Sequence, residues 1–100
     1  VHPSLMRLAR YDREHGTELM DTLFIYLQNA CNTQRSARML SLHKNTLLYR
    51  LGRIREILGC DLSSGEDQFM LQLSYRVLFY LDLFKSRLNI SRKDFRAEED

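Results

Sequence analysis

Apolar side chains recur at intervals of three and four residues along most of the chain, and the breaks between these runs predict five helices. The first is expected over about residues 4 to 14, because Pro3 suits a first helical position and Gly16 suits a helix terminus. The second is expected from Thr17, whose hydroxyl can cap it, to about residues 29 to 31. These two helices form the first half of a predicted helical domain.

A short third helix and a longer fourth helix follow, separated by a three-residue break at 41–43. Asn32 or Thr33 can cap the third helix. The fourth is expected over about residues 44–58, with Gly59 as its terminator. Its apolar residues lie at i, i+4, i+7 and i+11, which predicts a buried stripe. The members of this stripe are Leu47, Leu51, Ile54 and Leu58.

The last predicted helix is unusually apolar. Ser64 and Asp67 resemble a capping box and predict a helix over about residues 65–88. Twelve of the sixteen residues from 69 to 84 are apolar or tyrosine, so a single helix face cannot hold them all. Such a helix must be covered on several sides, either by the first two helices or by a partner chain. We therefore expect a homodimer, formed through residues 69–84.

Composition narrows the fold class. Apolar residues make up 44% of the chain and charged residues 28%, which is ordinary for a globular domain and excludes general disorder. With 4 Gly and 1 Pro, the chain has too few turn formers for a β-sandwich. The predicted fold is an all-α, five-helix orthogonal bundle that contains a helix-turn-helix over about 33–58 and the long apolar helix over about 65–88. We expect a DNA-binding domain over 1–90 and a flexible acidic tail over 91–100.

Several other function classes find no support in the sequence. Cys31 and Cys60 show no CxxC spacing, so neither a disulfide framework nor a zinc site is indicated, and a reducing cytoplasm is expected. No signal peptide and no apolar run of 18 residues is present, so no membrane contact is expected. No catalytic arrangement or phosphate loop stands out, so we expect no enzyme activity, cofactor or metal. Because the chain starts at Val1, it is expected to be part of a longer protein.

The positive charge of the chain is concentrated in its middle. Residues 31–58 carry six basic side chains and one acidic side chain, whereas residues 1–30 carry three and four, and residues 59–100 carry six and eight. A local excess of this kind is typical of a surface that meets phosphates, although a solvated helix face gives the same pattern. The charge therefore indicates a nucleic-acid partner only in combination with a suitable structural motif.

Two helices joined by a three-residue turn, the second of them basic, are suited to reading duplex DNA. The major groove is about 12 Å wide and admits one α-helix, while the preceding helix crosses the DNA backbone. Ala37 is small, as is needed where the two helices touch, and we expect Leu42 to hold the turn in the core. The residues expected to contact DNA are Thr33, Gln34 and Arg35 at the start of the third helix, and His43, Lys44, Asn45, Thr46, Tyr49, Arg50 and Arg53 around the fourth.

Each of these contacts has a structural alternative. His43 can stabilise the turn instead of meeting DNA, and Asn45 or Thr46 can cap the fourth helix. Arg50 and Arg53 can lie on solvated helix surface. Where contact with DNA does occur, each side chain can serve either a base edge or a phosphate.

A longer pattern around this motif resembles a known family. The run from His43 to Leu51 reads HKNTLLYRL, and it is preceded by four shorter pairs. The pairs are Tyr11-Asp12, Glu18-Leu19, Thr22-Leu23 and Tyr26-Leu27. Together they resemble the C-terminal helix-turn-helix domain of the purine-catabolism-regulator (PucR) family of bacterial transcription factors, over roughly residues 2 to 83. The HKNTLLYRL block is also similar to the helix-turn-helix of the factor for inversion stimulation.

The resemblance implies a DNA-binding output module that usually follows a sensory region of the same polypeptide. It also implies that the module acts as a dimer or larger oligomer on promoter DNA. One position departs from the common helix-turn-helix pattern, because Ser41 stands where many such proteins have glycine in the turn. A positive φ at this position would be strained for serine.

The sequence thus predicts sequence-specific binding of double-stranded DNA by a bacterial transcriptional regulator in the cytoplasm. The alternative is a helical interaction or oligomerisation module whose basic stripe meets an acidic protein. RNA is a poorer match, because the basic helix lacks the sheet-borne aromatic residues that stack on single strands.

Overall fold

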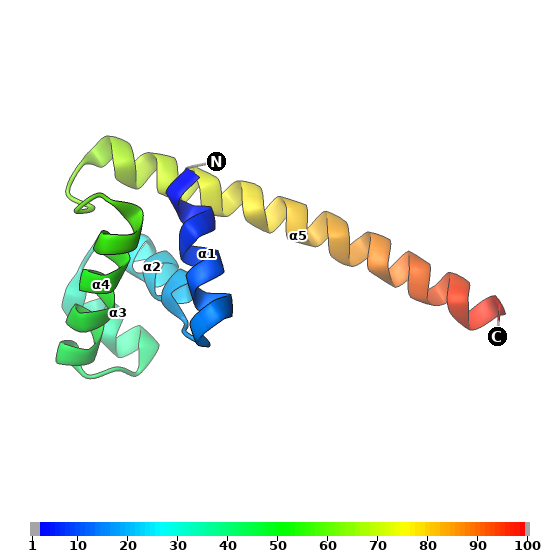
Figure 1. Ribbon diagram of the computed structural model, residues 1–100, viewed down its shortest axis with the longest axis horizontal. Coiled ribbons are helices and arrows are strands. Elements are labelled where there is room, and N and C mark those ends of the chain that lie inside the picture. Colours follow the sequence, from blue (N-terminus) through cyan, green and yellow to red (C-terminus); the bar gives the residue numbers. More distant parts are fainter. Residues whose placement is uncertain (1–2, 100) are drawn as a thin grey trace.

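The computed structural model describes the backbone of residues 3–99 and the side chains of residues 4–82. Within the described residues all regular structure is helical, and Figure 1 shows how the helices follow one another. The helices are α1 (Pro3–His15), α2 (Leu19–Gln28), α3 (Thr33–Leu40), α4 (Lys44–Leu58) and α5 (Gly65–Glu99). The all-α class and the helix-turn-helix over 33–58 are therefore confirmed.

The core lies where the helices cross, and its members come from the predicted apolar stripes. The fully buried aliphatic residues are Leu5, Leu8, Leu23, Leu47, Leu51, Ile54 and Leu71. All four residues predicted to form the buried stripe of α4 are buried. The short helix α2 contacts each of the other four helices, so it is the element around which the domain is assembled.

The start of α2 is capped by a residue of another helix. Both oxygens of the Asp12 carboxylate accept backbone N–H groups of α2, from Leu19 and Met20, each at 2.8 Å. Thr17 was expected to supply this cap, but its hydroxyl donates to Asp12 as well. That expectation is therefore wrong. The carboxylate satisfies two of the backbone donors that a helix start leaves unpaired, and it ties α1 to α2.

The last helix is longer than the sequence predicted. Its start agrees with the proposed capping box, since the backbone N–H of Asp67 donates to Ser64 Oγ at 3.3 Å. Its end does not fall near residue 88, because the backbone stays helical to Glu99 and no Gly or Pro after Gly65 interrupts it. Figure 1 shows α5 crossing the four-helix unit and projecting beyond it. The side chains of the predicted tail over 91–100 lie outside the described residues, and its flexibility stays a prediction.

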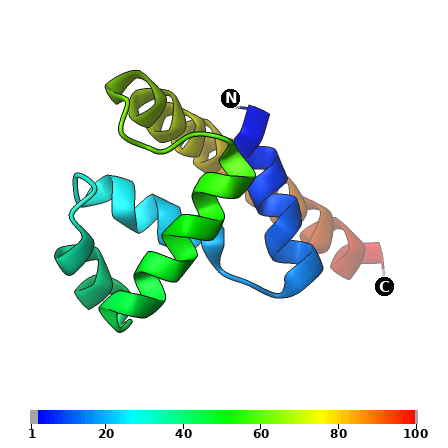
Figure 2. The ribbon, with the colours of Figure 1, turned by 60° about the vertical axis from the view of Figure 1, so that its left-hand side comes forward.

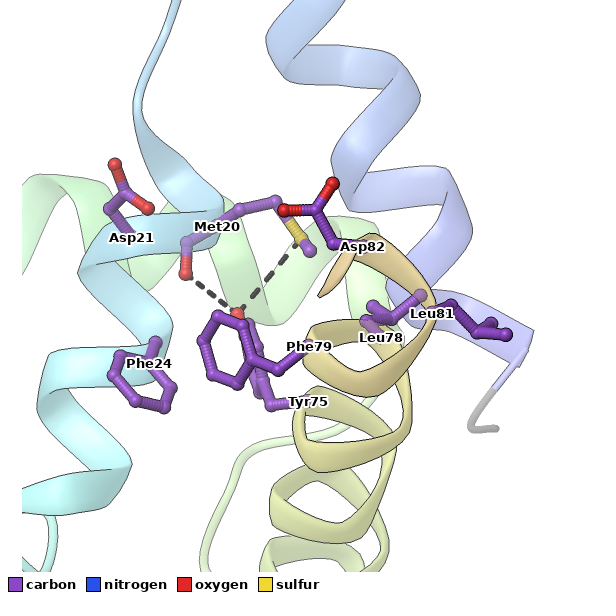
Figure 3. A pocket seen from close by; sticks show the side chains of 8 residues that line it. All are labelled: Met20, Asp21, Phe24, Tyr75, Leu78, Phe79, Leu81 and Asp82. Carbon is purple, nitrogen blue, oxygen red and sulfur yellow. Dashed lines mark hydrogen bonds between the residues drawn. The ribbon is translucent and has the colours of Figure 1, made fainter. Parts of the chain in front are cut away.

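The contact between α5 and α2 is built around one buried tyrosine (Figure 3). The Tyr75 hydroxyl donates to the backbone oxygen of Met20 at 2.7 Å. The ring of Phe24 on α2 faces the rings of Tyr75 and Phe79 on α5, with centroid distances of 5.3 and 5.2 Å. A cavity of about 360 Å³ opens beside these rings, between α2 and α5. Burial raises the pKa of Tyr75 far above its usual value, so the hydroxyl remains a donor.

We expect Tyr75→Phe to lower the free energy of unfolding by about 1 kcal/mol at neutral pH, because one buried hydrogen bond is lost. The raised pKa means that the folded state holds the phenolic proton more tightly than the unfolded state. The stabilisation from this group is therefore complete below about pH 10, the unfolded value, and is lost as the pH rises above it. Denaturant unfolding at neutral pH and melting curves from neutral to alkaline pH test both points. Equal alkaline slopes for the wild type and the variant would contradict the second.

Candidate nucleic-acid interface

The turn between α3 and α4 places these helices in fixed contact. Ser41 adopts a left-handed conformation with φ 55° and ψ 41°, which is the geometry that was foreseen as strained for serine. The next residue, Leu42, donates its backbone N–H to Ala37 at 2.9 Å and closes the turn. Ala37 is buried in the core, as its small size predicted. The turn therefore sets the angle at which α4 leaves α3.

Both helices of the motif have side-chain caps. Asn32 caps α3, since its Oδ1 accepts the backbone N–H of Arg35 at 2.8 Å. His43 caps α4, because its Nδ1 accepts the backbone N–H of Asn45 at 3.1 Å. The turn-stabilising role considered for His43 is thus present. The side chains of Asn45 and Thr46 are exposed and do not cap the helix.

One face of α4 is open along the whole helix. Figure 2 shows α4 on the outside of the four-helix unit, with α1 and α3 on either side of it. Asn45, Tyr49, Gly52 and Glu56 lie at i, i+4, i+7 and i+11, opposite the buried stripe. The Tyr49 residue is 70% exposed. We call this surface the outward face of α4. It is defined by Lys44, Asn45, Leu48, Tyr49, Gly52, Arg53 and Glu56.

The predicted contact residues gather on and beside the outward face, with one exception. Lys44, Asn45, Thr46, Tyr49 and Arg53 are all exposed on α4. The guanidinium of Arg53 pairs with Glu56 at 3.2 Å and lies 5.9 Å from the ring centre of Tyr11. At the start of α3, Gln34 and Arg35 are exposed and Thr33 is half-buried.

The exception is Arg50, which turns partly towards α2. It is half-buried, and its Nη1 donates to Thr22 Oγ1 at 3.1 Å. Thr22 is fully buried and itself donates to the Glu18 carbonyl at 2.8 Å. Among the described residues no other hydrogen bond to this guanidinium is found. Arg50 therefore holds α4 against α2 with one donor, while its remaining donors border a hollow of about 440 Å³ shared with Thr46 and Tyr49.

Comparison with known proteins assigns the chain to a family. The profile of the PucR C-terminal helix-turn-helix domain matches residues 19–77, which include α2, the whole helix-turn-helix and the first part of α5. The chain belongs to the PucR family. This family domain is the DNA-binding helix-turn-helix of transcriptional regulators, and it is not an enzyme.

Curated relatives agree with this assignment. The DNA-binding transcriptional activator AdeR of Bacillus subtilis is 35% identical over 80 residues, which are 80% of this chain and 19% of AdeR. The proline-responsive transcriptional activator PutR of the same organism is 40% identical over 74 residues, or 74% of this chain and 18% of PutR. The carbohydrate diacid regulator of Escherichia coli is 32% identical over 59 residues, or 59% and 15%. The chain thus spans less than a fifth of each relative. No solved structure is significantly similar to it.

Two residues of the PucR domain's outward face escaped the sequence analysis. Leu48 is 44% exposed although it is aliphatic, and Gly52 lies one turn further along the same face. The spacing indicates both residues, because Leu48 follows Lys44 by four residues and Gly52 follows Asn45 by seven. They were missed because only polar side chains were considered for contact with DNA.

The described part of the PucR domain shows no disulfide, no metal site and no membrane-spanning helix. Cys31 and Cys60 are both free thiols. Over the described part of the chain, no group of three or more His, Cys, Asp or Glu side chains is placed to hold a metal ion. Within the same residues, no helix has an apolar stretch long enough to cross a bilayer.

We expect Ser41→Gly to raise the free energy of unfolding by about 0.5 to 1 kcal/mol. Relief of the left-handed strain is worth about 1 to 2 kcal/mol, and the greater freedom of glycine in the unfolded chain offsets part of it. Denaturant unfolding of the two proteins measures the difference. Ser41→Ala is a suitable control, because alanine removes the hydroxyl but keeps the Cβ atom that strains the left-handed conformation. A loss of stability in Ser41→Gly would show that Ser41 contributes more than its backbone geometry.

Proposed function

We propose that this domain binds operator DNA sequence-specifically, with α4 in the major groove and α3 across the phosphate backbone. The observation that carries the proposal is the outward face of α4, which is uncovered along its whole length and rich in polar groups. A helix with its side chains is about 10 to 12 Å wide, which matches the groove. The helix carries four basic side chains and one acidic side chain, which gives it a net positive charge.

The side chains of α4 divide into base-facing and flanking groups. Asn45, Tyr49 and Arg53 occupy successive turns of the outward face. Asparagine can pair with adenine and arginine with guanine, each through two hydrogen bonds. Lys44 and Thr46 flank this row, where a phosphate or a thymine methyl group is within reach.

Residues outside the groove position α4. Thr33, Gln34 and Arg35 begin α3, where the positive end of the helix dipole and a basic side chain suit a phosphate. His43 fixes the start of α4 through its cap, and in the proposed complex its exposed ring lies beside the DNA backbone. Arg50 is held by Thr22, so its free donors are presented in one orientation to a phosphate or a base.

Selection of bound sequences from a random pool of duplexes tests the proposal directly. It reports whether duplex DNA is bound, which bases are preferred and whether the site has two symmetric halves. Affinity for the selected site should fall log-linearly with salt, with a slope of about −0.9 per phosphate neutralised. An interaction module without nucleic-acid partners would enrich no sequence.

We expect Arg53→Ala to weaken binding to the selected site by about 1 to 3 kcal/mol if Arg53 reads a base, and to relax the preference at that position. Arg76→Ala is the matched control, because it removes the same charge from an exposed position on α5. Titrations of labelled duplex at fixed salt measure both variants. Equal losses in the two variants would mean that only overall charge matters.

We further propose that the domain works as a homodimer formed through α5. The side of α5 that packs on the domain carries Leu71 and Tyr75, which are buried. The other side is an uninterrupted apolar surface that the described helices leave open. It consists of Phe69, Met70, Leu73, Val77, Tyr80 and Leu81. A second copy offers a matching apolar stripe, and two α4 helices would then read half-sites separated by about 34 Å or a multiple.

We expect Leu73→Glu to shift the chain from dimer to monomer, because paired helices would bury two unpaired carboxylates. Met6→Glu is the control, since Met6 is similarly exposed, at 48%, but lies on α1. Sedimentation equilibrium over a range of protein concentrations distinguishes the species. A wild-type chain that stays monomeric throughout, or a dimer that survives Leu73→Glu, would contradict this assembly.

The remaining parts of the proposal concern the whole regulator. The relatives are more than five times as long as the matched segment. We propose that a sensory region precedes the domain in the same polypeptide, and that the regulator acts on promoters in the bacterial cytoplasm.

A further inference from the structure

The outward face of α4 is hollowed at its middle. The hollow has a volume of about 250 Å³ and is open to solvent. Gly52 forms its floor because it has no side chain, and Leu48 lies one turn before it. The remaining walls are Tyr49, Arg53 and Glu56. A helix that presents only polar side chains to the DNA major groove does not require such a depression.

The fold gives no reason for glycine at this position. A Cβ atom built on Gly52 would have no neighbour within 4 Å, and its φ is not in the left-handed region. Glycine in a helix interior nevertheless costs stability relative to alanine. The missing side chain leaves the backbone of α4 open to close approach from outside the chain.

The chemistry of the walls restricts what this group can be. The Leu48 residue is 44% exposed, and its side chain is aliphatic, so one wall is apolar. The opposite wall carries the Glu56 carboxylate, paired with Arg53 at 3.2 Å. A phosphate would be repelled by this carboxylate. An uncharged, apolar projection fits better.

In the major groove, one base carries such a projection on its edge, because thymine presents a 5-methyl group there. We propose that Leu48 and Gly52 form a receptor for a thymine methyl group and so specify a T·A pair in each half-site. This inference rests on the proposed function, since it requires α4 to lie in the major groove. Leu48 supplies the apolar contact, and Gly52 supplies the space.

Replacing single thymines of the selected site by deoxyuridine tests the inference, because deoxyuridine lacks only the 5-methyl group. For the wild-type chain, one thymine position in each half-site should be sensitive, and replacing that thymine in a single half-site should weaken binding about fourfold, the value for burying one methyl group. The same replacement should have no effect on Leu48→Ser. Met6→Ser is the control, because it removes a similarly exposed apolar side chain from α1 and should keep the fourfold difference.

Gly52→Ala gives a second and independent measurement. Alanine should raise the melting temperature, because the helix gains a better helix former and no clash occurs inside the chain. It should also weaken binding to the thymine site, since the methyl of alanine fills the hollow. The opposite signs of the two effects separate a role in recognition from a role in folding.

Three results would overturn the inference. The first is wild-type binding that is indifferent to every thymine replacement, and the second is a loss that persists unchanged in Leu48→Ser. The third is a Gly52→Ala variant that binds the selected site as tightly as the wild type. Absence of binding to any duplex would overturn the proposed function together with this inference, whereas the three results above leave the proposed function standing.

Discussion

The rotation of α4 about its own axis decides what this domain can do. That rotation is set by the burial of Leu47, Leu51 and Ile54, each of which is fully enclosed by the other helices. A turn of the helix by one residue, about 100°, would bring polar groups into the core and aliphatic groups to the surface. Because both outcomes are costly, the outward face is held in place by the hydrophobic effect acting on the opposite side.

Polar contacts from other helices then refine this setting. The Asp12 carboxylate ties α1 to the start of α2, and Thr22 of α2 receives a hydrogen bond from Arg50 of α4. The hydroxyl of Thr22 has no exposure to solvent, so the hydrogen bond from Arg50 is made in a protected environment. The position of α4 thus depends on residues far from it in the sequence.

Much of this arrangement could be predicted from the sequence, because it depends on local rules. Helical spacing indicates the buried stripe of α4, and the three-residue break indicates a turn that strains Ser41. The cap from Asp12 could not be predicted in this way, since the capping residue belongs to another helix. The end of α5 was misplaced because charged residues near the C-terminus suggested a tail, although nothing there breaks a helix.

The candidate site shows the same division. The exposure of Tyr49 and Arg53 follows from their spacing relative to the buried stripe. The orientation of Arg50 does not, because it depends on how close α2 comes to α4. Leu48 was not predicted as a contact, because only polar side chains were expected to meet DNA. Its exposure is informative because the core of the domain is complete without it.

The central place of α2 has a consequence for genetics. This ten-residue helix contacts all four others, so its residues support the helix-turn-helix on one side and α5 on the other. Under the proposed function and assembly, substitutions in α2 should therefore be pleiotropic and should impair DNA binding and dimerisation together. Alleles that separate the two phenotypes should map instead to the free surfaces of α4 and α5.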